Sequence, residues 1–281
     1  MTSGAGPRLF EAASHAKLYS KFRPTYPKSV MQKILSFLLE KHSAPLELAV
    51  DIGCGSGQSS RSLTPHFKQV VGLDVSQVQI SQAQSKSVEE NLTYRQGSAE
   101  EIPFSDHSID LITCAQSLHW FNADKFYKEA SRTLKHQGCV AVYGYGVNLP
   151  YVPDEGIQTS MHQEYLKIYK DILGPHWDKR RYHVDNLYCN IQVPFRESKR
   201  DDSVVMEAVM SVDDMIGYIK TWSSYQTYIR TFPEKSDFLL KHRQKFLEII
   251  QPISPSTPAE EIRFDVRGPI FILLGRNSVR S

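Results

Sequence analysis

Cysteine is scarce in this sequence: only four of its 281 residues are cysteines. No two of them form a Cys-x-x-Cys pair, and none is spaced from a histidine in a way that is typical of a zinc site. Three lie in or beside apolar runs, where a reduced cysteine packs as a small hydrophobic residue. We therefore expect a reducing compartment, no structural disulfide and no bound metal. The four residues are Cys54, Cys114, Cys139 and Cys189.

Long apolar runs and an excess of one charge are lacking as well. No stretch approaches the roughly 18 apolar residues of a membrane span, and residues 1–17 have no apolar signal-peptide core. Lysine and arginine total 33 against 31 acidic residues, which gives a net charge of +2. The basic runs 179–181 and 199–200 adjoin aspartates, a pattern that favours solvated surface turns. We expect a cytoplasmic protein that binds neither nucleic acid nor membrane.

What the sequence does contain is the pattern of an α/β domain. Four short apolar runs with little polar alternation lie between residues 48 and 145, as is typical of parallel strands buried on both faces. Helix-like segments separate them, so a doubly wound, right-handed sheet is predicted. The runs are 48–52, 70–74, 109–115 and 139–143.

Helix signals lie in front of and between these runs. Met31, Ile34, Leu35 and Leu38 have the i, i+3, i+4, i+7 spacing of one helix face. Ser76, with Gln79 three residues later, predicts a capped helix start. Asn122 predicts another, and that helix is expected to end at Gly138.

The pattern changes after residue 147. Residues 148–250 are mostly helical in pattern and rich in aromatic residues, with the clearest helices predicted over 158–172 and 211–230. Residues 190–195 are strand-like, and the apolar run 268–277 is suited to a strand that returns to the sheet.

The glycine-rich stretch VDIGCGSGQSS (50–60) suggests a ligand loop. A phosphate-binding loop needs a lysine that is missing here, and a dinucleotide fingerprint needs its third glycine where a glutamine stands. The pattern D-x-G-x-G-x-G fits without adjustment. Gly53, Gly55 and Gly57 let the backbone turn sharply and approach a ligand closely. Asp51 can accept hydrogen bonds from an ammonium group, which S-adenosylmethionine carries.

Three further motifs follow in order. Asp74 ends the second apolar run, where a carboxylate can accept both ribose hydroxyls of a nucleoside. The turn GSAEEIPF (97–104) offers Ser98 and backbone amides to an adenine edge. The stretch AQSLHWF (115–121) follows the third run, at the carboxyl edge of the sheet where ligands bind.

Together these motifs resemble a class I S-adenosylmethionine-dependent methyltransferase, and they are most similar to the small-molecule group that includes trans-aconitate methyltransferases. YSKFRPTYP (19–27) matches the N-terminal segment of that group, and the resemblance covers roughly residues 15–145. It implies a seven-stranded Rossmann-like sheet with a mostly helical cap inserted before the final strands. It also implies S-adenosylmethionine as cofactor and S-adenosylhomocysteine as product.

We expect a single domain over residues 1–281. Its expected parts are an N-terminal helical segment over the cofactor site (1–45), a cofactor-binding core (46–147), a helical and aromatic substrate cap (148–255) and a final strand (256–281).

The resemblance, with the chemistry above, assigns candidate site residues. His119 is the candidate catalytic residue, although a packed core histidine is the alternative. For the aromatic residues, and above all for Trp222 and Tyr225 with their helical spacing, an ordinary core stripe is the alternative. The candidates for the acceptor are Tyr26, Trp120, Tyr145, Trp222 and Tyr225. The candidates for the cofactor are Asp51, Gly53, Cys54, Gly55, Gly57, Asp74, Val75, Ser98, Ala99, Glu100, Gln116, Ser117, Tyr19 and Arg23.

The expected reaction is in-line transfer of a methyl group to a small molecule, for which a carboxylate is one candidate acceptor. A carboxylate is ionised at pH 7 and needs no base, whereas a phenol, amine or carbon acid needs one, such as His119. Two alternatives stay open: a binding protein that acts only with a protein partner, and a protein or RNA methyltransferase. The sequence lacks a basic groove and an N/D-P-P-[YF] tetrapeptide for the latter. We expect a monomer or weak dimer.

Overall fold

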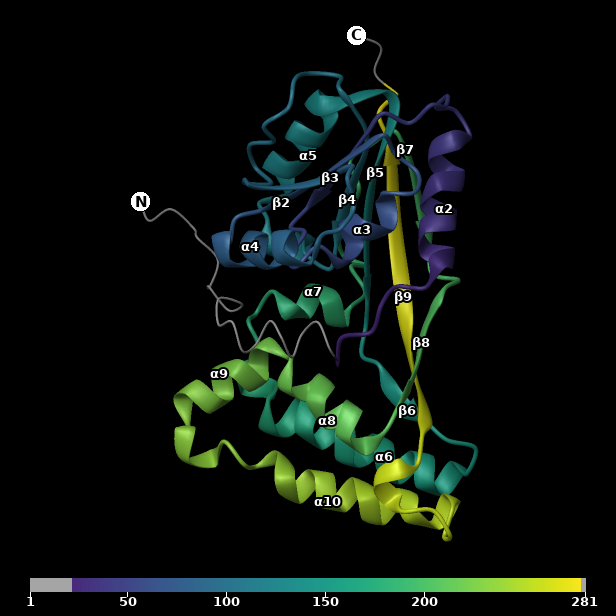
Figure 1. The fold of residues 1–281 in the computed structure, drawn as a ribbon, viewed down its shortest axis with the longest axis vertical. Helices are drawn as coiled ribbons and strands as arrows, with labels where there is room; N and C mark the ends of the chain where they lie inside the picture. The colour runs from purple at the N-terminus through teal and green to yellow at the C-terminus, as the bar shows by residue number, and fades with distance from the viewer. Residues whose placement is uncertain (1–21, 279–281) are drawn as a thin grey trace.

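The computed structural model of the protein describes residues 22–278. Nine strands in this part of the chain hydrogen-bond into one twisted sheet (Figure 1). Five of them are parallel, in the order β3-β2-β1-β4-β5, and their carboxyl ends face the helical layer at the bottom of the view. These strands are β1 (Leu48–Ile52), β2 (Gln69–Asp74), β3 (Leu92–Gln96), β4 (Ile109–Ala115) and β5 (Leu134–Tyr145).

The long strand β9 (Phe264–Arg276) joins two parts of the sheet. Its second half lies antiparallel between β5 and β7 (Glu197–Asp201), which completes the order β3-β2-β1-β4-β5-β9-β7. The predicted seven-stranded sheet is thereby confirmed. The first half of β9 pairs with β6 (Leu149–Tyr151) and β8 (Val205–Met210), so a small three-stranded extension reaches toward the helical layer.

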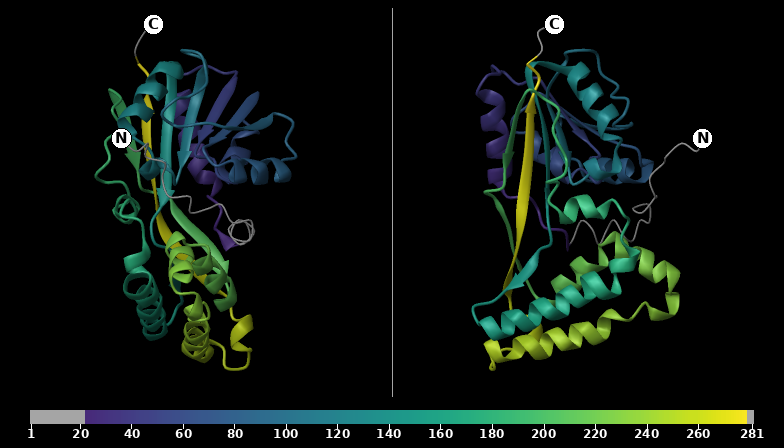
Figure 2. Two further views of the ribbon diagram at one scale, coloured as in Figure 1. Left: turned by 90° about the vertical axis from the view of Figure 1, so that its left-hand side faces the viewer. Right: turned by 180° about the vertical axis from the view of Figure 1, so that it is seen from behind.

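Helices cover both faces of the parallel strands, as the doubly wound prediction requires (Figure 2). The helices α2 (Lys28–Leu39), α3 (Gln58–Leu63) and α4 (Gln77–Lys86) pack on one face, and α5 (Ala123–Thr133) packs on the other. The predicted caps are confirmed, because the side chains of Ser76 and Asn122 accept hydrogen bonds from the first turns of α4 and α5.

The predicted end of α5 at Gly138 is wrong. The helix ends at Thr133, because Leu134 already pairs with Ile109 and begins β5. Gly138 lies inside that strand. The Cβ of any other residue at this position would lie only 3.0 Å from the Asp110 carbonyl oxygen, so the tight space favours glycine.

A helical layer with its own hydrophobic core lies beyond the carboxyl ends of the parallel strands. The predicted helix over 158–172 is α6 (Glu155–Leu166), which continues as a π-helical turn over Lys167–Ile172. The predicted helix over 211–230 is two helices, broken at Thr221 and Trp222. The other helices of the layer are α8 (Val212–Lys220), α9 (Ser223–Thr231) and α10 (Leu239–Ile250).

The strand predicted over 190–195 is wrong. That segment has no regular structure, and its side chains Ile191, Val193 and Phe195 pack against the sheet as a covering loop. The strand in this region is β7, which follows at Glu197. It lies at the edge of the sheet and is mostly polar, so no apolar run marks it.

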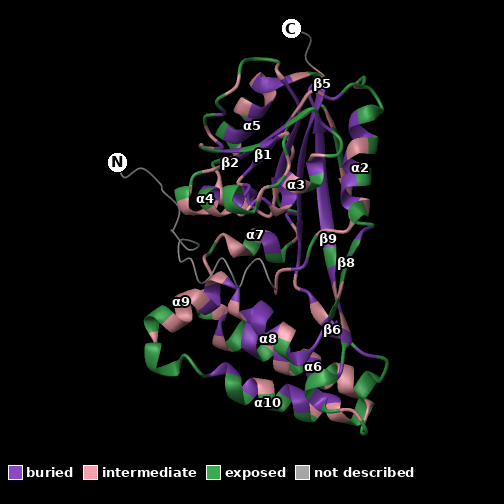
Figure 3. Ribbon diagram, viewed as in Figure 1, coloured by how far each residue is buried: buried purple, intermediate pink, exposed green. Residues whose placement is uncertain are grey.

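Burial follows this architecture (Figure 3). The central strands β1, β4 and β5 are almost fully buried, whereas β3 and β7 at the edges alternate or are largely exposed. Within residues 22–278, no helix has the length and apolar character needed to cross a bilayer.

Asp110 fixes the amino ends of β1 and β4, at the edge of the sheet opposite the glycine loop. Its buried carboxylate accepts hydrogen bonds from His42 Nε2 at 2.7 Å and Lys135 Nζ at 2.8 Å. The backbone N–H groups of Glu47 and Leu48 also donate to it, at 3.0 and 2.7 Å. Burial alone would raise the pKa of Asp110, but these donors outweigh it and hold the pKa at about 2.

We predict that Asp110→Asn removes a stabilising contribution that is present at neutral pH and absent in acid. The folded-state pKa lies below the ordinary value, so folding favours the carboxylate, and its contribution is lost as the pH falls toward 2. In urea titrations, the stability difference between the wild type and Asp110→Asn should shrink by about 2 kcal/mol between pH 5 and pH 2. The exposed Asp171→Asn variant should show no such trend. A constant difference for Asp110→Asn would contradict the assignment.

Candidate functional site

The glycine loop connects β1 to α3 in a conformation that few other residues adopt. Gly53, Gly55 and Gly57 have φ angles of +68°, +52° and +79°. The N–H groups of Gly53 and Cys54 both donate to the carbonyl oxygen of Leu73, at 2.8 and 3.0 Å. The loop is therefore anchored to the neighbouring strand β2, and its glycines are required by backbone geometry.

The space around the loop differs from one glycine to the next. A Cβ on Gly53 would lie 2.7 Å from the Ser117 side chain, and one on Gly57 would lie 2.0 Å from Tyr94 Oη. A Cβ on Gly55 would find its nearest neighbour only at 3.9 Å. Gly53 and Gly57 are thus packed against the protein, whereas the crest at Gly55 is open. An open crest at a strand-to-helix turn fits a nucleoside ligand that approaches the backbone.

Asp51 lies fully buried beneath this loop. Its carboxylate accepts hydrogen bonds from the hydroxyl groups of Ser60 at 2.6 Å, Thr113 at 2.8 Å and Ser59 at 3.4 Å. Burial raises the pKa of Asp51 to about 6, and the hydroxyl donors offset part of that effect. The buried carboxylate holds β1, β4 and α3 together, and its contact with an ammonium group, direct or through water, stays a prediction.

Asp74 ends β2 beside the crest of the loop. One carboxylate oxygen accepts the N–H of Gly55 at 2.9 Å, and the other accepts the N–H of Ser76 at 2.9 Å. Burial raises the pKa of Asp74, while the two N–H donors lower it. Each oxygen keeps a second lone pair, so the group can still accept two ribose hydroxyls. Val75, next in the chain, is 66% exposed and offers an apolar surface at the same place.

The turn over residues 97–104 satisfies much of its own polarity. The Ser98 hydroxyl donates to one oxygen of Glu100, and the backbone N–H of Asn122 donates to the other at 2.8 Å. Ala99 is buried between them. The side chains of Ser98 and Glu100 therefore tie the turn to the start of α5, and contact with an adenine through them stays a prediction.

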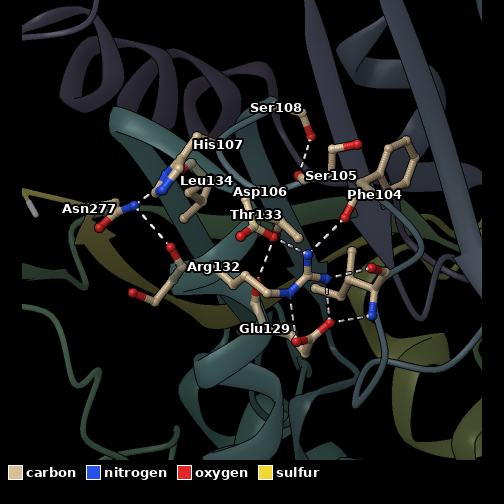
Figure 4. A network of polar contacts seen from close by, with 12 residues as sticks. Phe104, Ser105, Asp106, His107, Ser108, Glu129, Arg132, Thr133, Leu134 and Asn277 are labelled. Carbon is tan, nitrogen blue, oxygen red and sulfur yellow. Dashed lines mark hydrogen bonds and ion pairs between the residues drawn. The ribbon is translucent and has the colours of Figure 1, made fainter. Parts of the chain in front are cut away.

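A polar network from α5 fixes the rest of this turn (Figure 4). The Arg132 guanidinium donates to the carbonyl oxygens of Phe104 at 3.0 Å and Ile102 at 2.9 Å. It also pairs with Asp106 at 2.7 Å and with Glu129 at 2.7 Å. Glu129 in turn accepts the N–H of Ile102 at 2.9 Å. These residues belong to none of the predicted motifs, because they act on backbone groups far away in sequence.

Gln116 and Ser117 hold the carboxyl end of β4. The Gln116 side-chain amide pairs with the backbone of Tyr145, donating at 3.0 Å and accepting at 2.8 Å. Gln116 has a φ of +54°, unusual for a residue other than glycine. The Ser117 hydroxyl donates to the Ile52 carbonyl oxygen at 3.0 Å. The two side chains join the ends of β4, β5 and β1, so both predicted residues lie beside the glycine loop.

His119 follows in a short 3₁₀ turn and is held by Tyr188. The Tyr188 oxygen accepts the backbone N–H of His119 at 3.1 Å and lies 2.6 Å from its Nδ1. When the hydroxyl donates its one hydrogen to Nδ1, the proton of the neutral ring lies on Nε2. Burial, followed by the charges of Arg181 and Arg180, lowers the pKa of His119 to about 3. At pH 7 the ring is therefore a neutral hydrogen-bond donor.

Arg23 connects the segment before α2 both to the sheet and to the helical layer. Its guanidinium donates to the Tyr145 hydroxyl at 2.8 Å and to Thr221 Oγ1 at 2.9 Å. The Tyr26 ring lies between Tyr143 and Tyr145, with centroid distances of 4.9 and 5.7 Å. These predicted residues come together at the carboxyl end of β5. Tyr19, also predicted for the site, lies outside the described residues.

The predicted aromatic acceptor residues have different surroundings. Tyr225 packs against Phe238 within the helical layer, and Trp222 is nearly enclosed there. The Arg180 guanidinium lies 4.5 Å from the centre of the Trp120 ring. Core packing, the alternative left open by the helical spacing, describes Trp222 and Tyr225. Four rings surround Trp222 at 5.3–5.7 Å: Tyr165, Tyr169, Trp177 and Tyr218.

The basic run 179–181 forms the predicted turn only over its first two residues, of which Lys179 is exposed. Its last residue begins α7 (Arg181–Asp185), and the Arg181 side chain is only 17% exposed. Its guanidinium lies 4.6 Å from the centre of the Trp177 ring. An aromatic residue four positions earlier was the sequence signal for this burial. Within residues 22–278, no group of three potential metal ligands is found.

Comparison with known proteins gives a consistent result. A methyltransferase-domain family model matches residues 50–142. A Dictyostelium discoideum protein named as a candidate methyltransferase is 33% identical over 263 residues, which cover 94% of this chain and 93% of that protein. A Saccharomyces cerevisiae protein named as a candidate S-adenosylmethionine-dependent methyltransferase is 24% identical over 243 residues, covering 78% and 82%. A solved structure of a candidate type II methyltransferase from Anaeromyxobacter dehalogenans superposes with a TM-score of 0.73 at 26% identity, covering 92% and 100%.

We predict that Asp74→Asn weakens binding of S-adenosylhomocysteine about tenfold to a hundredfold, because a charged acceptor of two hydroxyl bonds is lost. Calorimetric titration of the two proteins measures this directly. The Asp124→Asn variant, in the exposed first turn of α5, is the matched control and should bind normally. Equal affinity of Asp74→Asn and the wild type would contradict the ribose assignment.

Proposed function

The chain belongs to the class I S-adenosylmethionine-dependent methyltransferases, and we propose that it methylates a small molecule on a carboxylate oxygen. The cofactor, when bound, supplies a methyl group already activated by a positive sulfonium. The task of the protein is to hold the cofactor, to align the acceptor and to exclude water. A closer relationship to the trans-aconitate group stays a prediction.

The residues of this chain fit the cofactor. The open crest at Gly55 would admit the nucleoside, Asp74 would accept the ribose hydroxyls, and the exposed Val75 would offer a surface to the base. Gln116 and Ser117 would border the methionine portion, because they close the neighbouring strand ends.

The protonation state of His119 carries the assignment of the acceptor. A ring whose pKa is about 3 is a very weak base at pH 7 and takes a proton poorly from a phenol or an ammonium group. Asp51 has a pKa nearer neutrality, but it is sealed beneath the glycine loop. A carboxylate needs neither group, because it is already ionised at pH 7. The Nε2–H of His119 would then donate a hydrogen bond that orients the acceptor.

Two alternatives rest on weaker ground. A binding protein that works only with a partner, or an enzyme acting on protein or RNA, agrees with the same cofactor site. No observation on residues 22–278 specifically favours either, and neither is proposed.

The chemistry of the product tests the proposed function. Wild-type protein is incubated with S-adenosylmethionine labelled on its methyl group, a metabolite extract and a panel of small carboxylic acids. We predict label that becomes volatile as methanol after alkali, because methyl esters hydrolyse whereas N-, C- and phenol-methyl groups do not. Asp74→Asn is the control for cofactor-dependent signal. Label that stays in an alkali-stable product would contradict carboxylate methylation.

The role of His119 predicts a particular pH profile. Because its pKa is about 3, kcat/KM for the accepting acid should be flat within about threefold from pH 6 to pH 9. His119→Gln keeps a side-chain N–H donor and should retain much of the rate, whereas His119→Phe should lose about tenfold, as expected for one hydrogen bond. An acidic limb with a midpoint between pH 6 and pH 7, present in the wild type and absent from His119→Gln, would show that His119 acts as a base.

A further inference from the structure

Arg181 is held rigidly between the sheet and the helical layer. Its Nε donates to the Tyr169 hydroxyl at 3.1 Å and to Asp185 at 3.0 Å. The face of its guanidinium packs on Trp177, with the Tyr169 ring 5.7 Å away. Figure 1 shows α7, which begins with this residue, directly below the carboxyl ends of the strands. Three residues, Tyr169, Asp185 and Trp177, therefore set the position of the guanidinium.

The other side of the Arg181 guanidinium is unused. Its two terminal nitrogens make no hydrogen bond to any residue that the structure describes, although the side chain is largely buried. Neither terminal nitrogen is a buried atom without a partner, so both reach the part of the side chain that is open to solvent and are available to an acceptor that enters from there. Arg180 differs, because Asp178 accepts from it twice, at 2.9 and 3.1 Å. Arg23 differs as well, because Thr221 and Tyr145 accept from it.

The charge of Arg181 acts on the residues that border the acceptor position. It is the first of the charges that lower the pKa of His119. Together with Arg23 it also acts on the hydroxyl groups of Tyr165 and Tyr218, which belong to the helical layer. Two guanidiniums, one from the segment before α2 and one from α7, thus bear on the same tyrosines. Asp178 and Asp185 do not cancel this field at His119.

We propose that Arg181 binds a carboxylate of the methyl acceptor through its two terminal nitrogens and so selects anionic acceptors. The planar fork of a guanidinium matches the two oxygens of a carboxylate, and a lysine cannot reproduce that geometry. This inference rests on the proposed function, since it concerns the acceptor at the same site. It makes Arg181 a specificity-determining residue, distinct from the donor His119.

A binding experiment tests Arg181 without turnover. The full chain, saturated with S-adenosylhomocysteine, is titrated with succinate, with benzoate and with their neutral amides, and the arginine Nε–H signals are followed by NMR. The Arg181 signal is identified by its absence from Arg181→Met. We expect it to shift saturably with a carboxylate and not with the amides, and we expect at least tenfold weaker binding in Arg181→Lys. A shift that the amides reproduce, no saturable shift, or saturation by inorganic phosphate alone would overturn the proposal.

A kinetic experiment separates this inference from the proposed function. With a methyl-accepting acid, Arg181→Lys should raise KM at least tenfold and change kcat much less. Arg243→Met is the matched control, because it removes an outer ion pair between Arg243 on α10 and Asp213 on α8 and should leave both constants unchanged. An unchanged KM in Arg181→Lys would refute the role of Arg181 and leave methyl transfer intact. Saturable carboxylate binding at Arg181 without any volatile methyl product would refute carboxylate methylation and leave the anion site intact.

Discussion

The glycine loop keeps its shape because a carboxylate, Asp51, is buried beneath it and hydrogen-bonded to three hydroxyl groups. No cation among the described residues pairs with it, so its desolvation is offset only by Ser59, Ser60 and Thr113. Those hydroxyls come from α3 and β4, and each must stay in place for the charge to be tolerated. Because Thr113 lies in β4, the same cluster sets the position of Gln116 and Ser117, which follow that strand, relative to the glycine loop. One polar cluster thus fixes the loop and one of the strand ends beside it.

The parts that sequence reasoning found are those set by local backbone demands. Apolar runs predicted β1, β2, β4 and β5. The positive φ values of Gly53, Gly55 and Gly57 explain why the spacing of these glycines predicted the ligand loop. The polar edge strand β7 left no comparable pattern, and the apolar side chains of 190–195 were used to cover the sheet instead. Arg181 was missed for a related reason: a basic run looks solvated until contacts with distant residues such as Tyr169 bury it. Local patterns cannot encode such contacts.

The surroundings of His119 connect the two proposals. Burial, followed by the charges of Arg181 and Arg180, keeps the His119 ring neutral, and the Tyr188 hydroxyl lies 2.6 Å from its Nδ1. A site of this kind handles proton removal poorly but suits an acceptor that arrives already charged. The same field would draw anionic molecules toward the carboxyl ends of the strands. Burial and the arginine charges therefore act together: both disfavour a protonated His119, and the charges also attract an anionic ligand.

The long strand β9 also limits how the molecule can move. It runs through the main sheet and the small extension, hydrogen-bonded along its length to β5 and β7 and then to β6 and β8. The helical layer is thus attached to the core by a stiff ribbon of continuous strands and not by a flexible linker. A hinge on that side would have to break ladder hydrogen bonds. Opening of the site is therefore expected on the opposite side, where α8 and α9 meet the segment before α2. Ligands would enter and leave when these helices move, while β9 stays in place.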